Sequence, residues 1–293
     1  MATLLQPRNF LRFGLQSKKP ILSDLAKRDA YDGLVIPANI LLYQHKATPL
    51  AIYNSDGKPF FVDPMSYLFG QPYEYFKRRV KNKGTSFKPS FDKLMQAHGL
   101  NSQTHLHIDY TQLLDTLHNR KEKMQAFVAN CLELQESTAK ASFAENAKGF
   151  LNEKDISRIA PKMAPEFLIP PYFLNDKDTI NLNIEILNMA LRTDYSEKIR
   201  PLVYVKPEDL TTDFGKALLR EYASMPFRGY CLWVDNFSEY DAEESTIADY
   251  IDFVHALSGG SKKELLIMYG GYFSFVLFYF GVSTVCHGIL YGE

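Results

Sequence analysis

The feature that most constrains the fold is a series of short apolar runs, rich in β-branched and aromatic residues, each followed by a turn and a helical pattern. Seven such runs occur, at 33–38, 59–64, 166–174, 200–205, 229–235, 264–271 and 283–293. They lack the alternation of a half-solvated strand, and this is typical of parallel strands covered on both faces. The sequence therefore predicts repeated βα units, with helices such as 207–224 and 242–257 between strands.

Repeated βα units favour a (β/α)₈ TIM-type barrel within the α/β class over an open sheet. Because only seven strands are found, we expect the barrel to lack its last strand or to be truncated there. The missing strand would come from elsewhere in the chain, from a longer chain or from another polypeptide. Residues 1–293 are expected to form a single barrel domain. Residues 70–145, first basic and aromatic and then helical, are interpreted as an insertion within it.

Composition narrows the classes of function. The net charge of −1 gives no overall attraction to nucleic acid or anionic membranes, so such contacts require a local patch. The most apolar stretch, 272–282, is about half the roughly 20 residues of a membrane-spanning helix, so no membrane association is expected. The three cysteines are too widely spaced for a disulfide framework or a zinc site, which suits the cytoplasm. No metal or cofactor is expected.

In a parallel barrel, the carboxyl ends of the strands build the active site. Acids, glycines and a histidine lie at these ends in this chain: Asp63, Asp235, Tyr269 with Gly270 and Gly271, and His287 with Gly288 and Glu293. Each also has a structural alternative. Asp63 precedes a proline and can begin a turn, Asp235 can cap a helix, and His287 can be a satisfied core histidine.

Two of these strand ends resemble segments of the tRNA-guanine transglycosylase family. "WVDNFSEYDA" is similar to the strand that ends in an aspartate before E-C-T-P-Y-P-A, and the two share Asp235, Tyr240 and Ala242, with Ser238 for threonine. "IMYGGYF" resembles the family's V-Q-G-G-V, with Tyr269 in place of glutamine.

Two further segments follow in the family's order. "HGILYGE" resembles G-G-L-A-V-G-E, matching at Gly288, Gly292 and Glu293, with Ile289 for leucine and His287 for the first glycine. "VDPMSYLF" more loosely resembles T-D-S-G-G-Y-Q and shares Asp63. Together the four segments cover about a tenth of the chain, and each motif alone is weakly specific.

The resemblance implies exchange of guanine for a 7-deazaguanine in tRNA or DNA, through cleavage and reformation of an N-glycosidic bond. It gives Asp63 a catalytic acid/base role. The residues it assigns to binding the purine-like base are Asp235, Tyr269, Gly270, Gly271, His287, Gly288, Ile289 and Glu293. The family's nucleophilic aspartate and its zinc cysteines lie beyond the last matching motif. This chain is therefore expected to lack the nucleophile strand.

A basic segment supports a nucleic-acid partner. Its cations are Lys77, Arg78, Arg79, Lys81 and Lys83, and tyrosines and phenylalanines surround them. Such a mixture is typical of a path for single-stranded nucleic acid, whereas the structural alternative is a solvated loop. A metal site at His105, His107 and Asp109, predicted to alternate on a strand, is a further alternative.

Two other functions remain open from the sequence. The chain can be a non-catalytic barrel subunit that binds nucleic acid or partner proteins, including a second copy of itself, in a larger assembly. It can also be an unrelated barrel hydrolase that uses Asp63 and Asp235 as acid and base.

Overall fold

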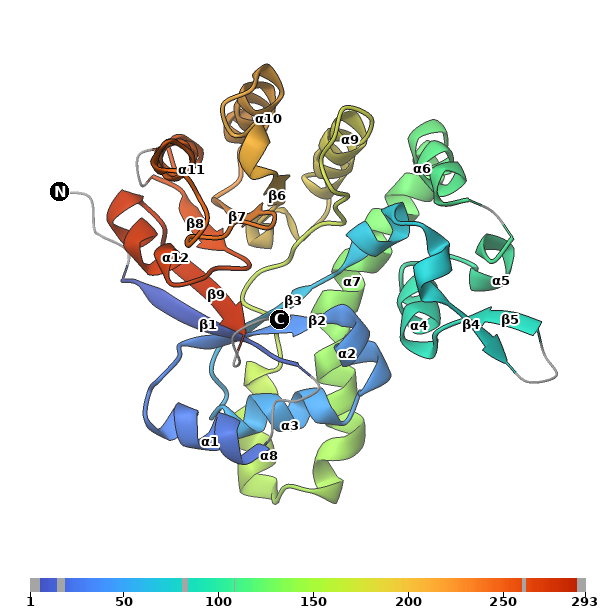
Figure 1. The fold of residues 1–293 in the computed structure, drawn as a ribbon. Coiled ribbons are helices and arrows are strands. Elements are labelled where there is room, and N and C mark those ends of the chain that lie inside the picture. Colours follow the sequence, from blue (N-terminus) through green and yellow to red (C-terminus); the bar gives the residue numbers. More distant parts are fainter. Residues whose placement is uncertain (1–5, 15–18, 81–83, 108, 260–261, 289–293) are drawn as a thin grey trace.

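A seven-stranded parallel sheet, strongly curled, forms the centre of the molecule (Figure 1). The computed structural model describes residues 6–14, 19–80, 84–107, 109–259 and 262–288. Along the sheet the strand order is β3-β2-β1-β9-β8-β7-β6. The strands are β1 (Arg8–Arg12), β2 (Gly33–Pro37), β3 (Phe60–Asp63), β6 (Leu202–Val205), β7 (Gly229–Val234), β8 (Glu264–Ile267) and β9 (Thr284–Gly288). The predicted α/β architecture with parallel strands is confirmed.

Helices surround the outer, convex face of the sheet, where outward residues such as Leu34, Val62 and Leu232 are buried against them (Figure 1). On one side lie α1 (Lys19–Lys27), α2 (Ala38–Tyr43), α3 (Ala47–Asn54) and α8 (Glu153–Ile159). On the other lie α9 (Ile180–Ala190), α10 (Asp213–Ser224), α11 (Glu244–Leu257) and the short α12 (Phe273–Val276). The helices predicted within 207–224 and 242–257 are α10 and α11.

The prediction of a TIM-type barrel is wrong, because the sheet is an open half-barrel whose edge strands β3 and β6 do not pair. Residues 166–174, expected as a strand between them, form one isolated bridge, Leu168 to Ile199. One further backbone bond joins Glu166 N to Phe60 O at 2.8 Å. The physical reason lies in Pro170 and Pro171, which have no N–H to donate to a ladder.

We call residues 166–175 the crossing segment. Three polar side chains from helical segments distant in sequence form hydrogen bonds with its backbone, in place of the missing ladder bonds. Gln135, which is completely buried, accepts from Ile169 N at 3.0 Å and donates to Ile169 O at 2.7 Å. Ser66 Oγ accepts from Tyr172 N and donates to Tyr172 O. Asn183 does the same for the N–H and C=O of Phe173, at 2.9 Å each. The segment is thus fixed without being a strand.

The prediction of a missing or truncated last strand is also wrong. The last strand, β9, pairs with β8 on one side and with β1 on the other. The strand that sequence analysis overlooked is β1, the segment "RNFLR" near the N-terminus. Because β1 and β9 are directly paired, the sheet has no free position between its last strand and its first.

The inner, concave face of the sheet has its own apolar core. Alternate residues of each strand point inward, and the crossing segment adds Phe167 and Ile169. The inward strand residues of this core are Phe10, Val35, Phe61, Leu202, Tyr204, Cys231, Leu266 and Cys286. These side chains fill the middle of the half-barrel, and Arg12, Asp63 and Asp235 are polar inward residues near its carboxyl edge.

Residues 70–145, predicted as an insertion, contain a projecting hairpin and four helices (Figure 1). These elements are β4 (Lys77–Val80), β5 (Gly84–Phe87), α4 (Pro89–Ala97), α5 (Ser102–His105), α6 (Tyr110–Asn119) and α7 (Lys121–Asn146). The helical part of this segment is interrupted at Arg120, between α6 and α7. Because α7 packs against α2, α3 and α9 and supplies Gln135, it covers the sheet like the other outer helices.

Complete burial of His98, at the end of α4, predicts an acid-sensitive fold. Its Nδ1 bonds to Leu94 O at 2.9 Å, its Nε2 has no hydrogen-bond partner among the described residues, and burial lowers its pKa to about 4. In the unfolded chain His98 has its ordinary pKa, near 6.5, so between about pH 6.5 and pH 4 the unfolded state binds a proton that the folded state does not. The free energy of unfolding therefore falls as pH falls through this window. We expect about 2 kcal/mol of unfolding free energy to be lost between about pH 7 and pH 5. Urea denaturation at both pH values measures this loss. In His98→Leu the loss should be much smaller, and an unchanged loss would contradict this assignment.

Candidate functional site

Eight side chains meet at the carboxyl edge of the concave face, and we call them the carboxyl-edge cluster. Its members are Arg12, Asp63, Tyr67, Tyr172, Tyr204, Trp233, Asp235 and Tyr269. Three of them, Asp63, Tyr172 and Tyr204, are buried, and the other five are half-buried. Of the sequence-predicted site residues, the cluster includes Asp63, Asp235 and Tyr269. Its other five members were not predicted.

Asp63, at the end of β3, is the buried centre of the cluster, with 0% exposure. Its Oδ1 accepts from Met65 N at 3.0 Å and from the Tyr172 hydroxyl at 2.9 Å. Its Oδ2 accepts from the Tyr269 hydroxyl at 2.9 Å. Burial, and then the charge of Asp63, raise the pKa of both tyrosines well above the ordinary value, so both hydroxyls stay protonated donors. The carboxylate is thus engaged by three donors within the protein.

Asp235 follows β7 and is half-buried. Its Oδ2 accepts from the Tyr204 hydroxyl at 2.8 Å and from Asn236 Nδ2 at 3.2 Å. Burial and the hydrogen bond to Asp235 raise the pKa of Tyr204, which therefore remains a donor. Within the described residues Oδ1 accepts no hydrogen bond, so this oxygen can accept one from a bound molecule.

Aromatic rings connect the two acids. Trp233 lies between three tyrosines, with ring centroids 4.6 Å from Tyr269, 5.2 Å from Tyr204 and 5.3 Å from Tyr67. Burial first, and then the charges of Asp63 and Asp235, raise the pKa of Tyr67. Asp63 and Asp235 each come two residues after an inward side chain, Phe61 and Trp233, so both acids lie on the concave face, around the same rings.

Arg12, the last residue of β1, adds the one positive charge of the cluster. Its guanidinium lies over the ring of Tyr269, 4.4 Å from the centroid, in a cation–π contact. Burial alone would lower the pKa of Arg12, but the neighbouring Tyr269 and Asp63 raise it above its ordinary value. The guanidinium makes no hydrogen bond or ion pair with any of the described residues.

The remaining predicted base-binding residues are placed differently. The turn of Gly270 and Gly271 is occupied by Glu239, which accepts from Tyr272 N at 3.1 Å and Phe273 N at 2.7 Å. A Cβ on Gly271 would lie 2.7 Å from a Glu239 carboxylate oxygen, so a larger residue there would force this carboxylate to move. His287 points to the outer face and lies against Phe275, with ring centroids 5.2 Å apart.

The last strand ends near the cluster but contributes little to it within the described residues. Gly288 is exposed at the end of β9, where it is the register partner of Arg12. Ile289 and Glu293, also predicted to bind the base, lie outside the described residues.

The predicted basic segment forms the hairpin β4–β5. Arg78 and Arg79 are exposed on β4, whereas Lys77 pairs with Glu74 at 3.1 Å. Lys81 and Lys83 lie outside the described residues. Most of the surrounding aromatic residues serve the core: Phe76 stacks on Phe91, and Tyr73 and Phe87 pack beside them. Tyr75, 69% exposed, is the aromatic residue near the hairpin that solvent can reach most freely.

The alternative metal site is not assembled. His105 ends the short helix α5 rather than lying on a strand, and Asp109 caps α6 by accepting from Thr111 N at 3.0 Å. Among the described residues, no group of three or more histidine, cysteine, aspartate or glutamate side chains is close enough to hold a metal ion.

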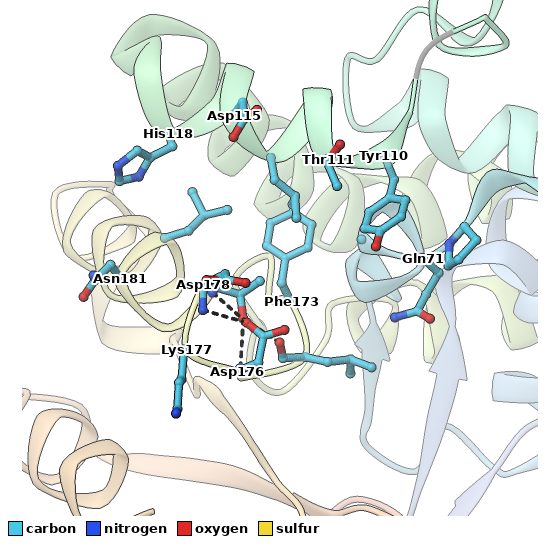
Figure 2. Close-up of a pocket in the computed structure, with 16 residues that line it drawn as sticks. Gln71, Tyr110, Thr111, Asp115, His118, Phe173, Asp176, Lys177, Asp178 and Asn181 are labelled. Atoms are coloured by element: carbon cyan, nitrogen blue, oxygen red, sulfur yellow. Dashed lines mark hydrogen bonds between the residues drawn. The ribbon is translucent and has the colours of Figure 1, made fainter. Parts of the chain in front are cut away.

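A separate pocket of about 690 Å³ lies between α6 and the start of α9 (Figure 2). Its polar residues include Asp115, His118 and Lys177, which Figure 2 shows spread around the rim rather than converging on one point. Asp176 Oδ1 accepts from the backbone of Asp178 and from Thr179, and so closes a local turn. The pocket contains no member of the carboxyl-edge cluster.

A scan of the sequence against protein-family models finds no match, and a search of curated proteins finds none with significant similarity. In the described part of the chain, no helix combines the length and the hydrophobicity needed to cross a bilayer. The chemistry of the carboxyl-edge cluster is therefore the basis for the function proposed below.

Proposed function

We propose that the carboxyl-edge cluster binds a guanine-type base, as the recognition step of a transglycosylase-like activity on tRNA or DNA. The observation that carries the proposal is the arrangement around Trp233. Asp235 has a carboxylate oxygen, Oδ1, that accepts no hydrogen bond from the described residues, and it follows the strand end that carries Trp233, whose half-buried ring contacts Tyr269. An aromatic wall beside a carboxylate suits a flat heterocycle that has hydrogen-bond donors on one edge.

Guanine fits this arrangement better than the other bases. Its Watson–Crick edge carries adjacent N1–H and N2–H donors, which a carboxylate accepts as a pair. Adenine places an acceptor, N1, at the corresponding position, and a carboxylate repels it. Stacking on an aromatic side chain adds about 1–3 kcal/mol per base and depends little on base identity. Asp235 would therefore provide the specificity, and Trp233 much of the affinity.

The nucleic-acid partner is part of the same proposal. Arg78 and Arg79 on the β4–β5 hairpin are exposed, and Tyr75 is exposed nearby. These cations can contact phosphates while the target base enters the cluster, and a base in a duplex would first have to flip out. The three cysteines are buried free thiols, which supports a cytoplasmic location for this activity.

We expect Asp235→Asn to weaken binding of 9-methylguanine by about 10- to 100-fold, since hydrogen bonds to a charged group contribute about 1.5–3 kcal/mol. The asparagine amide would lose the charge and present N–H groups toward the N–H groups of the base. Isothermal titration calorimetry measures the loss.

Two controls accompany this measurement. Asp252→Asn makes the same substitution on the exposed face of α11 and should leave the affinity unchanged. 9-Methyladenine should bind the unmodified protein much more weakly than 9-methylguanine. Equal affinities of the Asp235→Asn variant and the unmodified protein for 9-methylguanine would contradict the assignment of Asp235.

A second candidate function, base binding without exchange, is favoured by the position of Asp63. This carboxylate is completely buried and accepts three internal hydrogen bonds, so it is not free to attack a sugar or take a proton from a ligand. Incorporation of radiolabelled guanine into tRNA or duplex DNA distinguishes the two functions. Incorporation supports exchange, whereas binding of 9-methylguanine without any incorporation supports a non-catalytic binding subunit.

A further inference from the structure

Arg12 is a partly buried cation whose hydrogen-bond donors have no acceptor among the described residues. It lies at the inner end of β1, half-buried, and its guanidinium is held over the Tyr269 ring at 4.4 Å. The neighbouring acid, Asp63, accepts from Met65 N and two tyrosine hydroxyls and makes no ion pair with Arg12. Five guanidinium N–H donors thus remain without an acceptor among the described residues.

Partial burial of the guanidinium costs solvation; the nearby charge of Asp63 offsets this cost, but it accepts none of the N–H groups. The cation–π contact recovers part of this cost, about 0.5–2 kcal/mol, but satisfies no N–H. An acceptor brought by a bound molecule would pair with these N–H groups.

The position of Arg12 relative to Asp235 indicates which part of that molecule it meets. The guanidinium of Arg12 lies over the ring of Tyr269, and this ring contacts Trp233. Trp233 and Asp235 both point inward at the carboxyl end of β7. Arg12 and Asp235 therefore flank one pair of aromatic rings. A ring stacked there with its donor edge toward Asp235 would present another edge toward Arg12.

We infer that Arg12 recognises the second edge of the base, by donating two parallel hydrogen bonds to O6 and N7 of guanine. This inference rests on the base site proposed above. The planar guanidinium fork matches this pair of acceptors, and such a bidentate contact discriminates against other bases by about 1–3 kcal/mol.

A hydrogen bond from Arg12 to N7 would make the site selective at position 7 of the ring. A 7-deazaguanine has C–H in place of the N7 acceptor, and so keeps only the bond to O6. Adenine is disfavoured at both edges, because N6–H₂ would point at the guanidinium and N1 at the carboxylate. The site would thus prefer guanine, the base that leaves in the proposed exchange, over an unsubstituted 7-deazaguanine.

The test is calorimetric titration of the full chain with 9-methylguanine and its 7-deaza analogue, for the unmodified protein and two variants. Arg12→Gln removes the charge and the fork. Arg12→Lys keeps a positive charge near Tyr269 but offers a point donor instead of a fork. Arg220→Gln, on the exposed face of α10, is the matched control. Thermal unfolding of each variant establishes that it is folded.

The unmodified protein should bind 9-methylguanine about 5- to 50-fold more tightly than the 7-deaza analogue, and both Arg12 variants should lose that preference. The Arg220→Gln control should keep it. Equal binding of the two ligands by the unmodified protein, or an unchanged preference in both variants, would overturn the inference while leaving the base site intact. Failure of the unmodified protein to bind either ligand would overturn the proposed function, and this inference with it.

Discussion

Substitution of Asp63 by alanine should lower the free energy of unfolding by about 3–5 kcal/mol, although Asp63 contacts no bound molecule in our account. The alanine leaves three donors without their acceptor, namely the buried hydroxyl of Tyr172, the buried N–H of Met65 and the half-buried hydroxyl of Tyr269. Each unsatisfied buried donor costs about 1–3 kcal/mol, and the three costs are not strictly additive. Urea denaturation followed by circular dichroism measures the loss, with Asp252→Ala as the exposed control.

A double-mutant cycle separates this explanation from a general loss of packing. Tyr172→Phe alone should cost about 1–2 kcal/mol, because it removes a hydrogen bond to a charged group. In the Asp63→Ala background the same change should cost almost nothing, since the hydroxyl it removes has no acceptor there. Costs that simply add would show that Asp63 does not hold the tyrosines in place.

The second large effect is expected at Gln135, where Gln135→Met should cost about 2–4 kcal/mol of unfolding free energy. Methionine has a similar length, so the change removes hydrogen bonds without opening a cavity. It leaves the N–H of Ile169 unpaired, and its C=O with only the weak contact from Cys131 Sγ at 3.8 Å, at a point where no strand can replace the lost bonds. Gln125→Met, on the exposed face of α7, is the matched control and should be nearly neutral.

Hydrogen exchange gives the readout specific to this mechanism. The amides of the crossing segment 166–175 should exchange faster in Gln135→Met, while those of the central strands β1 and β9 change only with global stability. Loosening this segment also releases Tyr172, so binding of 9-methylguanine should weaken. Unchanged exchange at Ile169 would contradict the claim that Gln135 takes the place of a β-ladder partner.

The parallel architecture could be predicted from the sequence because most of the strands are apolar on both faces and are followed by amphipathic helices. Two segments were assigned wrongly from the sequence, for opposite reasons. Residues 8–12 form a central strand, yet "RNFLR" carries two arginines and does not look buried. Residues 166–174 look buried but cannot pair as a strand, because Pro170 and Pro171 lack N–H donors.

These two errors explain the predicted eight-stranded barrel with a missing end. The strand that the prediction lacked is β1, near the N-terminus, which pairs with β9. The segment 166–174, predicted as a strand, is instead held by hydrogen bonds to the side chains of Gln135, Ser66 and Asn183. Such side-chain pairing depends on three helices distant in sequence, and no local pattern indicates it.

The candidate site was predictable to the extent that strand ends could be located. Asp63, Asp235 and Tyr269 follow recognisable strands. Trp233 could have been found from Asp235, since residues two apart on a strand share a face. The same alternation places His287 opposite the inward Cys286, and hence on the outer face.

The remaining members of the cluster had no usable signal. Arg12 was overlooked together with β1. Tyr67 and Tyr172 come from segments without regular strand structure, and only the folded chain brings them to Asp63 and Trp233.

The central claim, that a base stacks inside the carboxyl-edge cluster, can be tested through the chain's single tryptophan, Trp233. Titration with 9-methylguanine should quench its fluorescence in a saturable way, with the same dissociation constant as calorimetry gives. Emission that stays unchanged while calorimetry reports binding would place the base elsewhere on the protein, and the account of this site would be wrong.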